Sequence, residues 1–304
     1  MASGSKKVIY AALIGNGLIA ISKFVGSAIT GSAAMLSEAI HSVVDTGNQI
    51  LLLLGLRRAK KPADNNYPFG HGKEIYFWSF VVAISIFAVG AGISIYEGIH
   101  SLMDPHPVTS PYINYIILSL AICFELGAWY FAWKEFKNIK GEKGFFEEVR
   151  TSKDPTTFVV LFEDSAALAG LVVAMVGIWL GQVTGNPIWD GIASIAIGVI
   201  LALTACWLAY ETKGLLIGES TEPDIVRGIS EIANKHKQVV RVNETLTLHM
   251  GPQYILVTIS ADFSDNVDAA FVEDEIAQLS KEIKDKFPRV KRVFIEAEEP
   301  KNNA

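Results

Sequence analysis

The sequence has little charge and little cysteine. Only 19% of its 304 residues are charged, and it contains two cysteines. Cys123 and Cys206 lie inside apolar runs and lack any paired spacing, so we interpret them as small, buried hydrophobic residues rather than as a disulfide or metal motif. The net charge of −6 does not suggest nucleic acid as a partner.

Apolar residues, in contrast, are abundant: half of the residues are hydrophobic, and the mean hydropathy is +0.32. They concentrate before about residue 215. A helix that crosses a bilayer needs roughly 20 mostly apolar residues. Six segments meet this requirement, and we expect six transmembrane helices at about 8–29, 33–56, 74–102, 111–133, 157–181 and 187–212.

Lysine and arginine are missing from three of the connections between these spans, at 30–32, 104–111 and 181–187. The other two connections, 57–73 and 134–156, are rich in both residues. Because cytoplasmic loops carry an excess of positive charge, we expect both termini to be cytoplasmic in a multi-pass protein of the cell (cytoplasmic or inner) membrane.

After the sixth span the pattern becomes that of a small soluble domain. Helical spacing at 224–236 precedes two alternating segments, 239–250 and 254–263; an amphipathic helix at 268–287 and a last alternating segment at 290–299 follow. The order α-β-β-α-β predicts a ferredoxin-like α+β unit with both helices on one face of a sheet. We therefore expect a transmembrane transport domain at 1–213 and a cytosolic dimerisation or regulatory domain at 214–304.

The second span contains ionisable residues in spite of its apolar character. His41 and Asp45 are four residues apart, so on a helix they share one face, and Glu38 lies one turn before His41. An ionisable side chain at the bilayer centre costs about 3 kcal/mol on insertion scales, so its presence indicates a functional site.

The fifth span adds two adjacent carboxylates, Glu163 and Asp164, near its start. An imidazole and carboxylates that converge from two helices are typical of a divalent-cation site. The candidate ligands are His41, Asp45 and Asp164, with Glu163 or water as the fourth. The alternative is a buried polar network that holds the helices together.

Four other polar residues carry less weight as candidate ligands. Lys23 either neutralises a nearby acid or extends to the membrane surface. Asn48 either donates a hydrogen bond to a metal ligand without contacting the metal, or forms a hydrogen bond between helices. Glu125 has no partner evident from the sequence, and Asp190 is expected to cap the start of the sixth span.

Four stretches together carry a family resemblance: GSAAMLSEAIHSVVDTGNQ, FGHGK, EDSAALAG and DGIASIAIG. With the α-β-β-α-β tail, they resemble the cation diffusion facilitator family of divalent-metal transporters over nearly the whole chain. The LFEDSA string of the fifth span is similar to the branch of the divergent vertebrate zinc transporter number nine.

The resemblance implies a homodimer that exchanges metal for protons by alternating access. It also implies a transport site with two ligands from the second span, matched by His41 and Asp45, and two from the fifth. Asp164 matches one of the latter; Val160 stands at the other position, and Glu163 is the expected substitute. A second family site matches Asp64 and His71, although a turn-forming role explains this pair as well.

From these features we predict a proton-coupled efflux antiporter for zinc or another divalent ion such as Mn, Co, Fe, Cd or Ni. Its expected partners are the ion, protons, the lipid bilayer and a second copy of the chain; we expect no other cofactor. An intramembrane enzyme is disfavoured because neither HExxH nor GxGD occurs. A metal-gated channel or metal-sensing receptor with the same buried site is the alternative.

Overall fold

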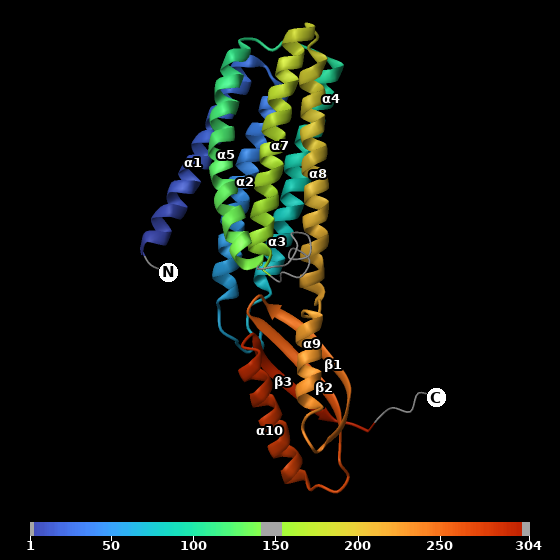
Figure 1. Ribbon diagram of the computed structural model, residues 1–304. Coiled ribbons are helices and arrows are strands. Elements are labelled where there is room, and N and C mark those ends of the chain that lie inside the picture. Colours follow the sequence, from blue (N-terminus) through green and yellow to red (C-terminus); the bar gives the residue numbers. More distant parts are fainter. Residues whose placement is uncertain (1–2, 141–153, 300–304) are drawn as a thin grey trace, which may run out of the picture. The chain divides into compact units, whose positions relative to one another are not determined.

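The computed structural model describes residues 3–140 and 154–299 (Figure 1). These residues form two compact units. One comprises 3–55, 77–140 and 155–212, and the other comprises 56–76, 154 and 213–299. The connection that follows the second predicted span therefore groups with the C-terminal part of the chain.

The first unit is a bundle of long helices. They are α1 (Ser3–Thr30), α2 (Ala33–Ala59), α3 (Glu74–Ser85), α4 (Gly92–Met103), α5 (Pro111–Lys140), α7 (Pro155–Thr184) and α8 (Ile188–Ile217). In Figure 1, α5 lies beside α7 and α1. Pro111 and Pro155 begin their helices at the position where a missing backbone N–H costs no hydrogen bond.

Five helical segments in the described part of the chain are long and apolar enough to cross a membrane: Ala33–Ala59, Glu74–Met103, Pro111–Lys134, Phe158–Thr184 and Ile188–Ile217. They correspond to the second to sixth predicted spans. The first predicted span is helical within α1, and its crossing stays a prediction. Large apolar side chains such as Leu18, Leu120 and Leu203 are exposed on the bundle, as suits a surface that faces lipid. The chain is a multi-pass membrane protein.

Two details of the bundle differ from the expectations. Cys123 and Cys206 are exposed rather than buried, because an apolar run in a lipid-facing bundle does not reveal which of its residues point inward. The third span is interrupted between α3 and α4 by a π-helical turn, η1 (Ile86–Ala91), in which the N–H of Gly92 donates to the carbonyl of Phe87. This turn contains only apolar residues and glycine, so the apolar pattern gives no sign of it.

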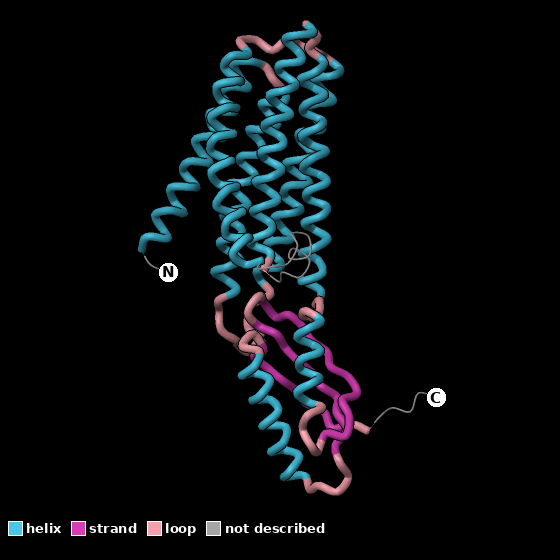
Figure 2. The backbone as a smooth tube through the Cα atoms, viewed as in Figure 1, coloured by secondary structure: helices cyan, strands magenta, loops and turns pink. Residues whose placement is uncertain are grey.

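The second unit contains α9 (Pro223–Ala233), β1 (Val239–Gly251), β2 (Tyr254–Phe263), α10 (Ala269–Lys286) and β3 (Val290–Ala297), in the expected α-β-β-α-β order. Figure 2 shows the strands as one sheet. The strand order is β1-β2-β3; β1 and β2 are antiparallel, and β2 and β3 are parallel. The parallel pair requires a crossover connection, which α10 provides.

Both helices of this unit share one core with the sheet. Ile255, Val257 and Ile259 alternate along β2 and are buried, so they lie on one sheet face. Ile229 of α9 and Leu279 of α10 are buried in the same cluster. A ferredoxin-like assignment of this unit stays a prediction.

Candidate metal site

Helix α2 presents His41 and Asp45 inside the bundle. Their closest atoms, Nε2 and Oδ2, lie 3.4 Å apart, and the side chains are one turn apart on the helix. His41 is only 1% exposed, yet neither ring nitrogen has a hydrogen-bond partner within the described residues, and Asp45 Oδ1 has none either. Buried polar atoms without partners are uncommon and call for an explanation. Both residues can offer these atoms to a cation.

Helix α7 brings Glu163 against α2. Asn48 Nδ2 of α2 donates a 2.6 Å hydrogen bond to Glu163 Oε1, so Asn48 is an interhelical partner, and its partner is a candidate ligand, which fits both interpretations of Asn48. The carboxyl groups of Asp45 and Glu163 are within hydrogen-bonding reach of each other. Asp164 is also buried and lies close enough to interact electrostatically with Glu163. Two carboxyl groups, one from each of the expected helices, therefore meet.

No partner of Glu125 in α5 is evident from the sequence, and the structure brings it close to other carboxyl groups. Its carboxyl group lies close enough to Asp45, Glu163 and Asp164 to interact with each of them electrostatically. The available signal was the position of Glu125 within an apolar span, which indicates function by default. Pairing it with the fifth span requires knowing that α5 packs against α7.

The chemistry of this group fits a divalent cation. Carboxylates this close together in a medium of low dielectric repel one another unless a proton or a cation lies between them. An imidazole with carboxylates is a ligand set for zinc and for harder divalent ions. However, no three His, Cys, Asp or Glu side chains in the described part of the chain are already arranged to hold an ion. Asp45 and Glu163 meet, and His41 lies 3.4 Å from Asp45, but in this arrangement they do not form a three-ligand group with Asp164.

A buried ion pair lies next to this group. Lys23 Nζ of α1 is 3.0 Å from Glu38 Oε2 of α2 and donates a 2.8 Å hydrogen bond to Ser42 Oγ. Both charged side chains are fully buried. Lys23 therefore neutralises an acid within the bundle and does not extend to the membrane surface.

Asp190 caps a different helix from the expected one. Ser32 Oγ donates to Asp190 Oδ1 at 2.6 Å, and the N–H of Ala33 donates to Oδ2 at 2.5 Å. These groups belong to the start of α2, whereas the sequence placed the cap at the start of α8. A carboxylate near a helix N-terminus satisfies free N–H groups and favours the helix dipole, whichever element carries it. Asp190 thus anchors the helix that bears His41.

The second predicted pair lies in the other unit. His71 Nε2 is 2.9 Å from Asp64 Oδ2, while Asp64 Oδ1 accepts hydrogen bonds from the backbone N–H groups of Asn66 and Tyr67. The hydrogen bond with His71, followed by these backbone bonds, lowers the pKa of Asp64. Gly70, at φ +83°, completes the turn. The turn-forming role is therefore present, and metal binding by the pair stays a prediction.

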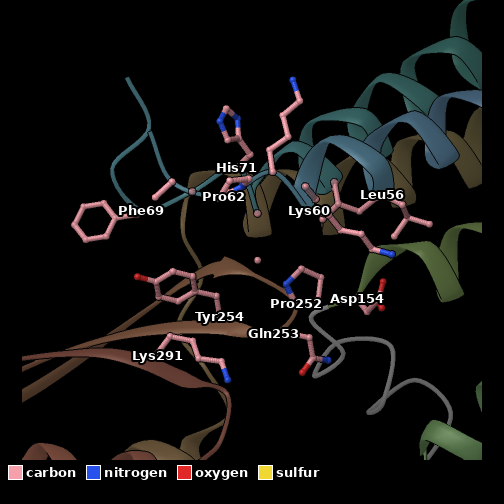
Figure 3. A pocket seen from close by; sticks show the side chains of 17 residues that line it. Leu56, Lys60, Pro62, Phe69, His71, Asp154, Pro252, Gln253, Tyr254 and Lys291 are labelled. Atoms are coloured by element: carbon pink, nitrogen blue, oxygen red, sulfur yellow. The ribbon is translucent and has the colours of Figure 1, made fainter. Parts of the chain in front are cut away.

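His71 also borders a cavity of about 500 Å³ within this unit. Figure 3 shows its walls, with the chain around Lys60 and Phe69 on one side and Tyr254 and Lys291 on the other. The side chain of Asp64 is 52% exposed, so a ligand of the Asp64–His71 pair would be accessible to solvent.

Two histidines of the C-terminal domain, His236 and His249, have different surroundings. His236 Nδ1 lies 2.8 Å from Glu275 Oε1, and its Nε2 lies 3.1 Å from Glu282 Oε2. His249 is buried within β1. A metal ion at His236 would have to displace an existing carboxylate contact.

Known proteins resemble the chain over most of its length. The family model described as the cation efflux transmembrane domain matches residues 9–217. The "Proton-coupled zinc antiporter SLC30A9, mitochondrial" of Xenopus laevis is 35% identical over 266 residues, which are 87% of this chain and 48% of that protein. The human protein of the same name is 34% identical over 87% of this chain and 47% of its own length. "Metal tolerance protein C4" of Arabidopsis thaliana is 28% identical over 86% of this chain and 57% of that protein.

The chain spans about half the length of the SLC30A9 relatives that it matches. The matched region includes α2 and α7, which bring Asp45 and Glu163 together. On these grounds the chain belongs to the cation efflux, or cation diffusion facilitator, family and is related to the SLC30A9 antiporters.

Proposed function

We propose that this chain exports zinc or a similar divalent cation in exchange for protons. The ion binds between α2 and α7, to His41, Asp45, Glu163 and Asp164. The observation that carries the proposal is the meeting of Asp45 and Glu163 from two helices, beside a buried imidazole whose nitrogens have no partner among the described residues. Relatives named as proton-coupled zinc antiporters support the choice of ion and of counter-ion.

The exchange follows from competition at the site. Carboxyl groups at hydrogen-bonding distance share a proton when no metal is bound, because two adjacent carboxylates repel each other. A metal ion needs deprotonated ligands, so its binding releases protons. If α2 and α7 expose the site alternately to the two sides of the membrane, each passage of metal in one direction is coupled to protons in the other.

The arrangement in the membrane is part of the same proposal. The lysines and arginines at 57–73 favour a cytoplasmic position for that connection and for both termini, in the cell membrane. Residues 1–213 then form the transport domain, and residues 214–304 form a cytosolic domain through which two copies dimerise. Asp64 and His71 would be a second, cytosolic metal site.

Reconstitution of the full chain in liposomes tests the function. A zinc-sensitive dye and a pH-sensitive dye should report zinc and proton fluxes in opposite directions, because the two ions compete for one site. Loss of a residue that hydrogen-bonds to a metal ligand costs up to roughly 100-fold in activity, and Asp45→Asn, which alters a ligand itself, should lower the zinc flux by more than that. Asp224→Asn, which neutralises an exposed carboxylate of α9, is the matched control and should leave the flux unchanged.

Wild-type flux in the Asp45→Asn protein would refute the site. Zinc flux that neither moves protons nor responds to a pH gradient would instead support the metal-gated channel.

A further inference from the structure

The ion pair between Lys23 and Glu38 has no part in the exchange described above. Its atoms are 3.0 Å apart, and the ammonium group has two further acceptors, Ser42 Oγ at 2.8 Å and the Glu38 carbonyl oxygen at 3.5 Å. Burying two charges is expensive, and a neutral pair of similar size is often as stable. Stability alone is therefore a weak reason for a charged pair at this position.

The carboxylate of Glu38 is only partly used by Lys23. Its second oxygen, Oε1, is buried without a hydrogen-bond partner in the described part of the chain. It lies so close to α7 that a Cβ atom at Gly170 would overlap it. Glycine at this position therefore gives a free carboxylate oxygen a place against α7, the helix that carries Glu163.

Along the axis of α2, Glu38 comes between His41 and the residues that line a cavity at the end of the bundle where Gly31 and Ser32 join α1 to α2. This cavity has a volume of about 210 Å³, and Ser27 and Leu36 are part of its lining. Along α2, Glu38 follows Leu36 by two residues and precedes His41 by three. The lining of the cavity also includes Glu97, His100, Asp104 and His106, and its carboxylates attract cations.

We propose that Glu38 is a further cation-binding carboxylate on the path between the His41–Asp45 site and this cavity. In the absence of a metal ion, Lys23 forms an ion pair with the Glu38 carboxylate and serves as its counter-cation. The inference rests on the proposed function. At equal distance a divalent ion attracts a carboxylate twice as strongly as an ammonium group does, so the metal ion displaces Lys23. The released ammonium group keeps Ser42 Oγ as an acceptor and does not need to leave the bundle.

The test is to measure zinc binding to the full chain in lipid nanodiscs. The proposal predicts opposite changes in zinc affinity for two variants. Lys23→Met frees the carboxylate and should tighten zinc binding at least about tenfold while slowing zinc flux in liposomes. Glu38→Gln leaves an unneutralised ammonium group beside the site and should weaken binding at least about tenfold. If both variants weaken zinc binding, or neither changes it, the pair is structural and the proposal is overturned.

A double variant keeps the test decisive if an unpaired buried charge prevents folding of the single variants. Lys23→Met/Glu38→Gln carries no unpaired charge. It should bind zinc within about threefold of the wild type and lose at least about tenfold in flux. Wild-type flux, or loss of zinc binding, in the double variant overturns the proposal.

The matched control removes another buried polar contact of α1. Thr30 Oγ1 donates to Asn114 Oδ1 of α5 at 3.0 Å, and Thr30→Val/Asn114→Leu should retain both zinc affinity and flux. An equal loss of flux in this control would also overturn the proposal. Failure of the wild-type chain to bind or move zinc would refute the proposed function itself, which separates the two outcomes.

Discussion

Asp190→Ala is expected to destabilise the bundle and to impair zinc transport, although Asp190 is not a candidate ligand. The substitution removes the acceptor of two buried hydrogen bonds, from Ser32 Oγ at 2.6 Å and from the N–H of Ala33 at 2.5 Å. A hydrogen bond to a charged group contributes about 1.5–3 kcal/mol, and loss of a helix cap costs about 1 kcal/mol. The two figures overlap because the bond to Ala33 is the cap. We therefore expect a loss of about 3 kcal/mol in the free energy of unfolding.

The assay is unfolding of the full chain in mixed micelles as the fraction of denaturing detergent is raised. Asp190→Asn keeps one acceptor oxygen and should cost less than Asp190→Ala. Asp224→Ala removes an exposed carboxylate of α9 and should change the free energy by no more than about 0.5 kcal/mol. Zinc flux should fall with stability across this series, because α2 carries His41. A wild-type transition in the Asp190→Ala protein would refute the account of α2 as a helix capped by α8.

Two further predictions concern the fourth ligand and the pH dependence of the C-terminal unit. Glu163→Ala should weaken zinc binding, and Val160→His should shift metal preference from Mn towards Zn; an unchanged metal profile in both would remove Glu163 from the site. Burial alone would raise the pKa of Glu222, but hydrogen bonds from Thr221 and Arg289 lower it to about 2. The lowered pKa stabilises this unit above the unfolded pKa of about 4.3, and the contribution disappears as the pH falls towards 2. Thermal unfolding of Glu222→Gln should show a weaker pH dependence over that range, and an identical dependence would contradict the assignment.

The features that were predicted from the sequence depend on local pattern. Apolar runs of sufficient length identified five spans because a bilayer imposes a minimum length on each helix. Alternation identified β1 and β2 because one face of their sheet is buried beneath α9 and α10. The π-helical turn at Ile86–Ala91 was missed because it changes the hydrogen-bond spacing without changing the apolar character of the chain.

The candidate site shows the same limit. The spacing of His41 and Asp45 placed them on one face of α2, and the structure has them there. The bond between Asn48 and Glu163, the approach of Glu125 and the cap from Asp190 join residues that are far apart in the sequence. Each depends on which helices pack together, and no periodicity within one helix contains that information. The sequence allows Lys23 to neutralise an acid, but only the packing of α1 against α2 identifies that acid as Glu38.

At the proposed site, an ion would have to displace partners that the carboxyl groups already have. A site for a passing ion must bind strongly enough to admit the ion and weakly enough to release it. Glu163 already accepts a hydrogen bond from Asn48, and Glu38 is already paired with Lys23. An arriving ion must therefore displace Asn48 and Lys23 from these carboxylates, which lowers the net affinity of the site for the ion. When the ion leaves, Asn48 and Lys23 are close enough to pair with the carboxylates again. A rigid, fully formed shell would bind the metal more tightly in one state of the protein, but it would retain the ion instead of passing it on.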